Sequence, residues 1–377
     1  MQQNRAQPGA QPGAQSRTVY ERIVFVSRLS AIGDVLIAMR AVNTLYKNNY
    51  FPIFITSFNT KEIVMESPYL HAFICFNKKQ GAQFFIDKKE VDKANFSQYV
   101  KNLQTAKKPI FLDLQKTSRS GKAYSYIKKD LALYFEKKYV VQKRTFYRIM
   151  LVILAWLHFS QKKYSNLSKI KRIHDLQEDQ IKKIVSNDKK IFAPLSKQSL
   201  LLNKQLSSHP KKYICIFPGA SGFIKMWPKE NFQSLITAVL QETSLDIFIC
   251  GTGKTEGFLG EFLSAQKNER IINVVNKTTL TDILNLIASA KYVVTNDSFA
   301  AHAADAFCIP GTVIFGSTSP SFGFVPMFEH IFIAYENLAC SPCTRHGKGK
   351  CRFENLKCLR NLGYKEILDK IIQYNPE

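Results

Sequence analysis

The sequence alternates short apolar runs with helix-forming segments, and it does so twice. In the first half, the apolar run 22–28 (RIVFVSR) is followed by a turn at 29–34 and a helical segment at 35–46. Strands that alternate with helices are typical of a parallel sheet covered by helices on both faces. The first half therefore predicts an α/β domain, with further strands at 52–56, 72–76 and 109–114.

The second half repeats this rhythm after a polar stretch at 189–212. Strands are predicted at 213–217, 246–250, 292–295 and 312–315, with helices between them. Because 377 residues exceed what one core usually holds, we expect two Rossmann-like domains that face a central cleft. The predicted division is a disordered lead at 1–19, an acceptor-side domain at 20–195, a donor-binding domain at 210–365 and a C-terminal tail at 366–377, with a helical, Lys-rich stretch at about 130–188.

The chain is strongly basic, with 53 Lys and Arg against 29 Asp and Glu. Such a charge attracts nucleic acid, an anionic membrane surface or phosphorylated substrates, and charge alone does not separate these partners. A Lys-rich proteome would give the same composition. The first 18 residues are polar and lack the apolar core of a secretion signal, so we expect a cytoplasmic protein.

The most apolar run, 149–157 (IMLVILAWL), is about half as long as a membrane-spanning helix. It predicts a buried or interfacial helix, with core packing as the favoured role. The alternative is peripheral docking on the inner face of a membrane. The basic residues that flank the run and would support docking are Lys143, Arg144, Arg148, Lys162 and Lys163.

The turn at 295–298 (TNDS) leads directly into a helix of small residues. Ser298 is placed to cap that helix, whose free N–H groups and positive dipole end suit a diphosphate. His302 lies one turn further on and can donate to a phosphate oxygen. The alternative is a well-capped core helix with a buried histidine.

A second anion-binding loop is predicted at 217–228 (FPGASGFIKMWP). Its two glycines let the backbone approach an anion, with Ser221 and Lys225 beside it, unless Lys225 is a solvated surface residue. The glycine turn at 251–253 is a weaker indication. There Glu256 either bonds a ribose or merely begins a helix.

In the first half, Asp34 directly follows a glycine turn at the end of the first strand, where open α/β sheets carry out chemistry. It can act as a general base, or it can simply complement the helix dipole. The segment after the fourth strand supplies Gln115, Arg119 and Lys122, which we expect to bind a phosphorylated acceptor.

Taken in order, these segments resemble the lipopolysaccharide heptosyltransferases of glycosyltransferase family nine, which have the GT-B fold. The matching segments are RLSAIGDVL at 28–36, LDLQKTSRS at 112–120, FPGASGFIKMWPKENF at 217–232, DSFAAH at 297–302 and GSTSP at 316–320.

The resemblance implies an inverting transfer of heptose from ADP-heptose to the Kdo or heptose of a lipid A–Kdo type acceptor, without a required metal cofactor and without nucleic acid. It implies that Asp34 is the base and that Lys225, assisted by Ser221, contacts the donor phosphates. Asp297, Ser298 and His302 would hold the donor.

Two positions depart from the family pattern. Phe299 stands where the family commonly has glycine, and its ring would crowd a close phosphate unless it turns away. Arg40 stands where a proline is usual, and arginine is compatible with a helix.

Four of the eight cysteines form the cluster Cys340, Cys343, Cys351 and Cys358, with His346 nearby. Its first pair has the spacing of a zinc knuckle, and its later gaps are looser. The cluster predicts a structural segment, with a structural zinc ion as one option and disulfides as a weaker one.

Two alternatives to the main hypothesis remain. One is a family-nine enzyme that uses another sugar nucleotide, because no motif here distinguishes a hexose from a heptose. The other is a basic, zinc-stabilised nucleic-acid-binding protein with a degenerate Rossmann core, for which Asp34 would be dispensable.

Overall fold

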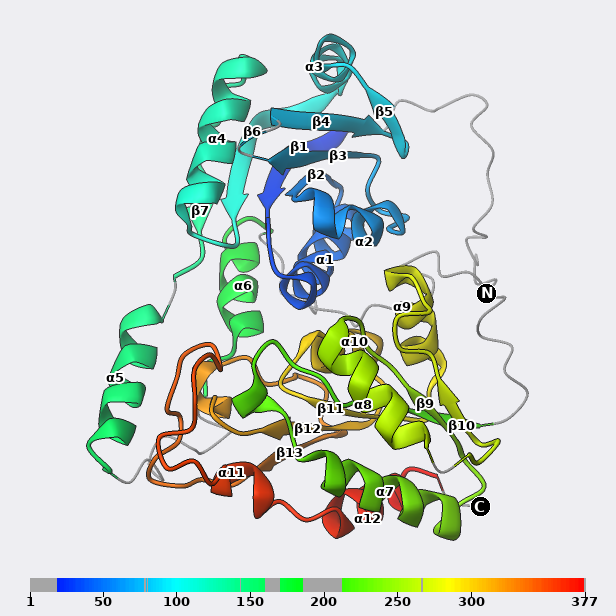
Figure 1. The fold of residues 1–377 in the computed structure, drawn as a ribbon. Helices are drawn as coiled ribbons and strands as arrows, with labels where there is room; N and C mark the ends of the chain where they lie inside the picture. The colour runs from blue at the N-terminus through cyan, green and yellow to red at the C-terminus, as the bar shows by residue number, and fades with distance from the viewer. Residues whose placement is uncertain are drawn as a thin grey trace, which may run out of the picture.

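A computed structural model describes residues 19–375, apart from 78, 80, 143, 160–169, 186–211 and 266. Two sheets, each covered by helices, lie one above the other (Figure 1). The predicted α/β fold with two Rossmann-like halves is therefore confirmed. Residues 1–18 of the predicted lead and the predicted boundary near 190–210 lie outside the described residues.

The first sheet has seven strands in the order β5-β4-β3-β2-β1-β6-β7. Its centre is parallel, and β4 and β5 add an antiparallel edge that the sequence analysis did not predict. The short strand β7 lies inside the stretch predicted to be helical. The strands are β1 (Tyr20–Ser27), β2 (Tyr50–Thr56), β3 (Ala72–Asn77), β4 (Gly81–Ile86), β5 (Lys89–Val91), β6 (Thr105–Asp113) and β7 (Lys138–Val140). The accompanying helices are α1 (Ile32–Lys47), α2 (Lys61–Met65), α3 (Lys93–Asn102), α4 (Ser118–Asp130), α5 (Thr145–Trp156) and α6 (Ile173–Lys182).

The second sheet has six parallel strands in the order β10-β9-β8-β11-β12-β13, which is the doubly wound Rossmann order. Its strands are β8 (Tyr213–Phe217), β9 (Asp246–Ile249), β10 (Ile271–Asn273), β11 (Tyr292–Asn296), β12 (Gly311–Phe315) and β13 (Ile331–Tyr335). Its helices are α7 (Lys229–Glu242), α8 (Lys254–Ser264), α9 (Leu280–Ser289), α10 (Phe299–Phe307), α11 (Lys357–Arg360) and α12 (Lys365–Gln373). The segment predicted as a C-terminal tail contains α12, whose buried Ile367 and Ile371 join the core of this half.

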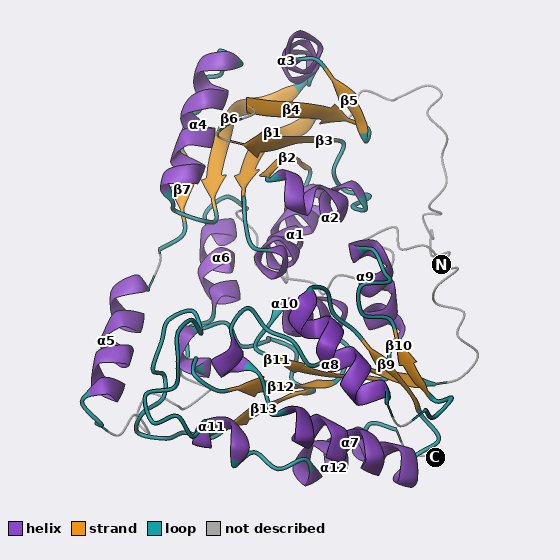
Figure 2. Cartoon of the chain, in the orientation of Figure 1, coloured by secondary structure: helices purple, strands orange, loops and turns teal. Residues whose placement is uncertain are grey.

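Helices α1 and α10 lie between the two sheets and pack against each other (Figure 2). One apolar core fills this middle layer and reaches the facing sides of both sheets. A second core joins the outer face of the second sheet to α7 and α12, and a third joins the outer face of the first sheet to α3 and α4. The two halves therefore share one apolar core, which passes through α1 and α10.

The apolar run at 149–157 forms most of α5, which stands at the edge of the molecule (Figure 1). Leu151 and Ala155 are buried, whereas Phe146, Ile153 and Trp156 are more than half exposed. Core packing, the favoured role in the sequence analysis, is thus wrong for most of this helix. Among the described residues, no helix is long and apolar enough to cross a bilayer.

The strand ends of the two sheets are aligned so that their loops meet. Ser27 at the end of β1 pairs with Asp113 at the end of β6, and Thr295 of β11 pairs with Phe217 of β8. In each sheet these two strands are neighbours, and the strands that follow them in the chain lie on opposite sides of the pair. Ligands of doubly wound sheets bind at such switch points.

Candidate active site

A cavity of about 1480 Å³ lies between the two halves, lined by the loops after β1, β6, β8 and β11. Nine of the ten predicted catalytic, donor-binding and acceptor-binding residues line it, and Gln115 does not. The nine are Asp34, Arg119, Lys122, Ser221, Lys225, Glu256, Asp297, Ser298 and His302. The fold thus brings together residues from five separate segments, which follow β1, β6, β8, β9 and β11.

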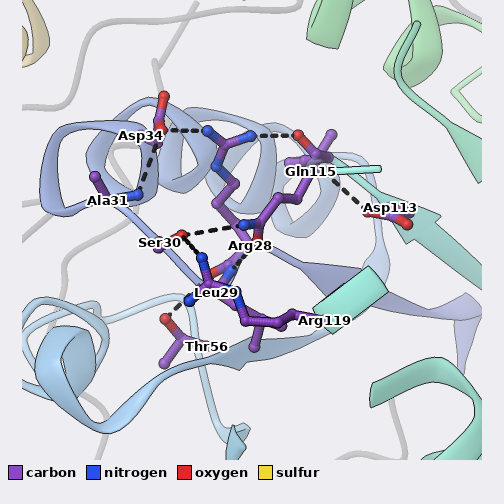
Figure 3. Close-up of polar contacts among 10 residues, drawn as sticks. Arg28, Leu29, Ser30, Ala31, Asp34, Thr56, Asp113, Gln115 and Arg119 are labelled. Carbon is purple, nitrogen blue, oxygen red and sulfur yellow. Dashed lines mark hydrogen bonds and ion pairs between the residues drawn. The ribbon is translucent and has the colours of Figure 1, made fainter. Parts of the chain in front are cut away.

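Asp34 lies in the first turn of α1, where a carboxylate complements the helix dipole. Its Oδ2 pairs with the guanidinium of Arg28 and accepts from the Ala31 backbone N–H at 3.3 Å (Figure 3). Its Oδ1 is buried and has no hydrogen-bond donor among the described residues. The carboxylate is therefore fixed through one oxygen, and the residue lines the cavity.

The loop that carries Asp34 is held from β6. Arg28 is 6% exposed and donates to the Leu114 carbonyl at 2.6 Å. The side chain of Gln115 accepts from the Leu29 N–H at 2.8 Å and donates to Ser30 Oγ at 3.0 Å (Figure 3). Gln115 is itself 5% exposed. The prediction that it contacts the acceptor is not supported, because both ends of its amide are used to hold this loop.

The N-terminus of α10 opens onto the same cavity. Ser298 caps the helix by accepting from the Ala300 N–H at 3.3 Å, as predicted, and its hydroxyl also bonds Thr295 Oγ1 at 2.9 Å. The ring of Phe299 lies edge-on to Phe217, with centroids 6.3 Å apart. Phe299 thus forms part of the cavity wall beside the cap.

Lys225 reaches this helix from the loop after β8. Its Nζ lies 2.8 Å from Asp297 Oδ2, which also accepts from Thr318 Oγ1 at 2.8 Å. The residue is 8% exposed, so the alternative of a solvated surface lysine is excluded.

Asn296, which the sequence analysis did not select, joins the loop after β8 to the turn before α10. Its Oδ1 accepts from the Trp227 N–H at 2.9 Å, and its Nδ2 donates to the Pro218 carbonyl at 2.8 Å. It is fully buried at the end of β11. A polar residue at the end of a buried strand is the sequence signal that would have identified it.

Glu256 lies in the first turn of α8 and packs beneath two glycine turns. A Cβ placed on Gly219 would lie 2.3 Å from Glu256 Cγ, and one placed on Gly251 would lie 3.0 Å from it. The two glycines therefore let both turns approach the Glu256 side chain. The carboxylate of Glu256 lines the cavity, where a ribose bond stays a prediction.

His302 of α10 packs against α1, the helix that carries Asp34. A Cβ placed on Gly33 would lie 2.5 Å from His302 Cδ2, so the glycine lets α1 approach the imidazole ring. His302 is 9% exposed, and burial lowers its pKa below the ordinary histidine value, although the charge of Asp34 opposes this shift. The ring is therefore neutral at neutral pH.

This lowered pKa predicts a loss of stability on mild acidification. Because the folded protein binds the His302 proton less readily than the unfolded chain, stability is complete above about pH 6.5 and falls below it. We expect the thermal midpoint of His302→Gln to fall less than that of the wild type between pH 7.5 and 5.5. Parallel curves for the two proteins would contradict the assignment.

The four clustered cysteines line a separate small cavity beside Trp156. All four are free thiols, and burial raises the pKa of Cys343 to about 11 and of Cys358 to about 12. No group of three or more His, Cys, Asp or Glu side chains in the described part of the chain is arranged to hold a metal ion. A structural zinc ion at these cysteines therefore stays a prediction from their spacing.

The sequence model of glycosyltransferase family 9 (heptosyltransferase) matches residues 131–355, more than half of the chain. The chain belongs to glycosyltransferase family 9. The matched range contains Lys225, Ser298 and the first three residues of the cysteine cluster, and it does not include Asp34. The family match therefore includes the region around Lys225 and Ser298. The assignment of Asp34 rests on the geometry of the structure.

Comparison with individual proteins gives relatives of the same kind. The chain is 28% identical over 173 residues to lipooligosaccharide heptosyltransferase 2 of Campylobacter jejuni, covering 45% of this chain and 53% of that protein. It therefore spans about half the length of the curated relatives it matches. Two Escherichia coli structures share its fold at 15% identity. They are heptosyltransferase WaaC with ADP (TM-score 0.62; 94% of this chain and 100% of that chain) and ADP-heptose lps heptosyltransferase II (TM-score 0.61; 94% and 98%).

Proposed function

We propose that this family 9 chain transfers heptose from ADP-heptose to the Kdo or heptose of a lipopolysaccharide inner core, with inversion and with Asp34 as general base. The observation that carries the proposal is the shared cavity. Asp34 of the first half and the capped N-terminus of α10 in the second half both line it, and Gly33 packs on His302 between them. A base and an anion site thus face the same space.

The geometry supports a single displacement. The acceptor hydroxyl attacks the anomeric carbon while the bond from that carbon to the ADP oxygen breaks, which inverts the centre. The Asp34 carboxylate takes the hydroxyl proton, and its ion pair with Arg28 fixes its orientation. The free N–H groups of α10 and the ammonium of Lys225 stabilise the charge that develops on the departing diphosphate.

The charges of the cavity favour polyanionic substrates. Its lining holds six Lys and Arg side chains against three carboxylates. The cations are Lys79, Arg119, Lys122, Lys225, Arg345 and Lys348, and the acids are Asp34, Glu256 and Asp297. Arg119 also donates to Ser30 Oγ at 3.4 Å, close to the base loop. We assign Arg119 and Lys122 to a phosphorylated or carboxylated acceptor of the lipid A–Kdo type, at the inner face of the cytoplasmic membrane.

Thermal-shift titration with nucleotides tests the proposal. ADP and ADP-heptose should raise the unfolding midpoint more than UDP or GDP and their sugars do, because a ligand stabilises the folded state in proportion to its affinity. A stronger response to UDP or GDP sugars would favour the alternative of a family 9 enzyme with another donor. No response to any nucleotide, together with salt-sensitive nucleic-acid binding, would favour the nucleic-acid-binding alternative.

Within the same titration, Lys225→Met should bind ADP about tenfold or more weakly. The change removes one charge-assisted bond to phosphate and leaves Asp297 facing the diphosphate with Thr318 as its remaining partner. Methionine keeps an aliphatic stem beside Gly347. Lys291→Met is the control, since Lys291 is exposed at the opposite end of β11. Equal ADP affinity in all three proteins would show that Lys225 serves only its bond to Asp297.

A further inference from the structure

Helix α5 exposes a continuous apolar face that no part of the described chain covers. Leu151 and Ala155 point to the protein and are almost fully buried. The opposite side of the helix carries large apolar side chains at spacings of three, four and three residues, which places them in one row. We call them the α5 face: Phe146 (82% exposed), Ile149 (36%), Ile153 (52%) and Trp156 (57%).

The end of α5 is fastened to the cysteine-rich segment. Trp156 Nε1 donates to the Cys343 carbonyl at 3.3 Å, and Arg352 donates to the Trp156 carbonyl at 3.0 Å. The Arg352 guanidinium also lies 5.3 Å from the centre of the Trp156 ring. Phe353, 45% exposed, contacts His158 and extends the apolar surface beyond the helix. The α5 face is thus held rigidly on the second half of the molecule.

Positive charge lies at both ends of this face, at Arg144 and at Arg352. Arg144 at the start of α5 stacks on Tyr147, with its guanidinium 4.1 Å from the ring centre. Between residues 340 and 360 every Lys and Arg side chain is exposed, and Glu354 is the one acid in that stretch of sequence. These cations are Arg345, Lys348, Lys350, Arg352, Lys357 and Arg360.

Arg148 has a different role from the one expected in the sequence analysis. It points inward from α5, with its guanidinium 4.4 Å from the ring centre of Phe324, which lines the substrate cavity. Arg345 and Lys348 of the basic segment line the same cavity. The exposed apolar face and the substrate cavity are therefore joined by shared elements.

We propose that the α5 face docks on an anionic phospholipid bilayer, with Trp156 and Phe146 entering the interface and the basic segment contacting lipid phosphates. An apolar row flanked by arginine and lysine is the arrangement that binds such surfaces. A second copy of this chain would meet the same positive segment and be repelled. The proposal rests on the proposed function in one respect: it names the surface that brings a membrane-anchored acceptor to the cavity.

Co-sedimentation of the full chain with vesicles tests this surface. We expect binding to phosphatidylcholine vesicles that contain phosphatidylglycerol, weaker binding without it, and release by salt. A double variant, Phe146→Asp with Ile153→Asp, should bind at least about tenfold more weakly, because each change removes buried apolar area and adds a negative charge. Phe258→Asp on α8 is the matched control, since Phe258 is 59% exposed, and it should bind like the wild type.

Tryptophan emission provides a second measurement. The chain has two tryptophans, and Trp227 is 2% exposed, so a blue shift on vesicle addition reports Trp156. No shift and no sedimentation, or equal sedimentation of the wild type and the double variant, would overturn the proposal. So would a wild-type dimer that the double variant converts to a monomer. ADP stabilisation of each variant shows that it is folded, and it tests the donor site independently of the vesicles.

Discussion

Asp34→Asn is expected to lower the turnover number for sugar transfer by about 10²- to 10⁴-fold, the range typical for loss of a general base. Asparagine has nearly the same volume, and its amide cannot accept the proton of the acceptor hydroxyl. The reaction would be followed as ADP release from ADP-heptose with a saturating acceptor. Because the lost contact matters in the transition state, turnover should fall much more than donor affinity does.

The thermal midpoint and the ADP affinity of this variant serve as controls. Arg28 would lose its charged partner and keep its bond to the Leu114 carbonyl, so we expect a folded protein of reduced stability. Asp130→Asn, at a partly exposed carboxylate on the outer helix α4, should leave turnover unchanged. Unchanged turnover in Asp34→Asn would show that the carboxylate only complements the dipole of α1. That alternative was open from the sequence.

Local sequence signals predicted much of the site because each of its residues follows the end of a strand. Asp34, Lys225 and Ser298 each come soon after a buried apolar run, and the carboxyl ends of parallel strands meet at one edge. The order of strands and loops along the chain was enough to predict that these residues lie in one cavity. The contacts of Gln115 could not be predicted, because its direction depends on the register of β1 against β6, which turns its amide toward Leu29.

Other features depend on contacts between distant segments. The run at 149–157 is apolar on nearly all sides, so its periodicity could not show which face is open. The antiparallel edge strand β5 has only three residues, and the turn between β4 and β5 carries charged residues, which hides this edge from a search for buried parallel strands. Arg40 was noted only as a departure from the family pattern. The structure shows that it is a buried contact between the two halves.

Arg40 of α1 crosses the middle layer to reach Asp305 of α10. It donates to the Asp305 carbonyl at 2.5 Å, and its Nη2 lies 3.6 Å from the carboxylate. His174 of α6 lies 3.1 Å from the other carboxylate oxygen, and the backbone N–H of Met327 donates at 2.8 Å. Burial raises the pKa of Asp305, but the charges of His174 and Arg40 and the surrounding hydrogen bonds hold it well below the usual range. This carboxylate therefore links α10 to α1, to α6 and to the loop that contains Met327.

Asp305→Ala should lower the free energy of unfolding by about 3–5 kcal/mol, because it leaves the Arg40 guanidinium buried without a counter-charge. Asp305→Asn should cost less, since the amide oxygen can still accept from the backbone. Asp130→Ala, which breaks the more exposed pair with Lys93, should cost at most about 1 kcal/mol. Denaturant titration of the full chain measures these differences.

The decisive comparison is a double-mutant cycle with Arg40→Met. If Asp305→Ala is costly because it leaves Arg40 unpaired, the same change should cost much less when Arg40 has already been replaced. Additive losses would instead show that Asp305 acts through its backbone partners at residues 327 and 328. Because α1 carries Asp34 and α10 carries Ser298, a strong coupling would also mean that one buried pair holds the base and the donor helix in register.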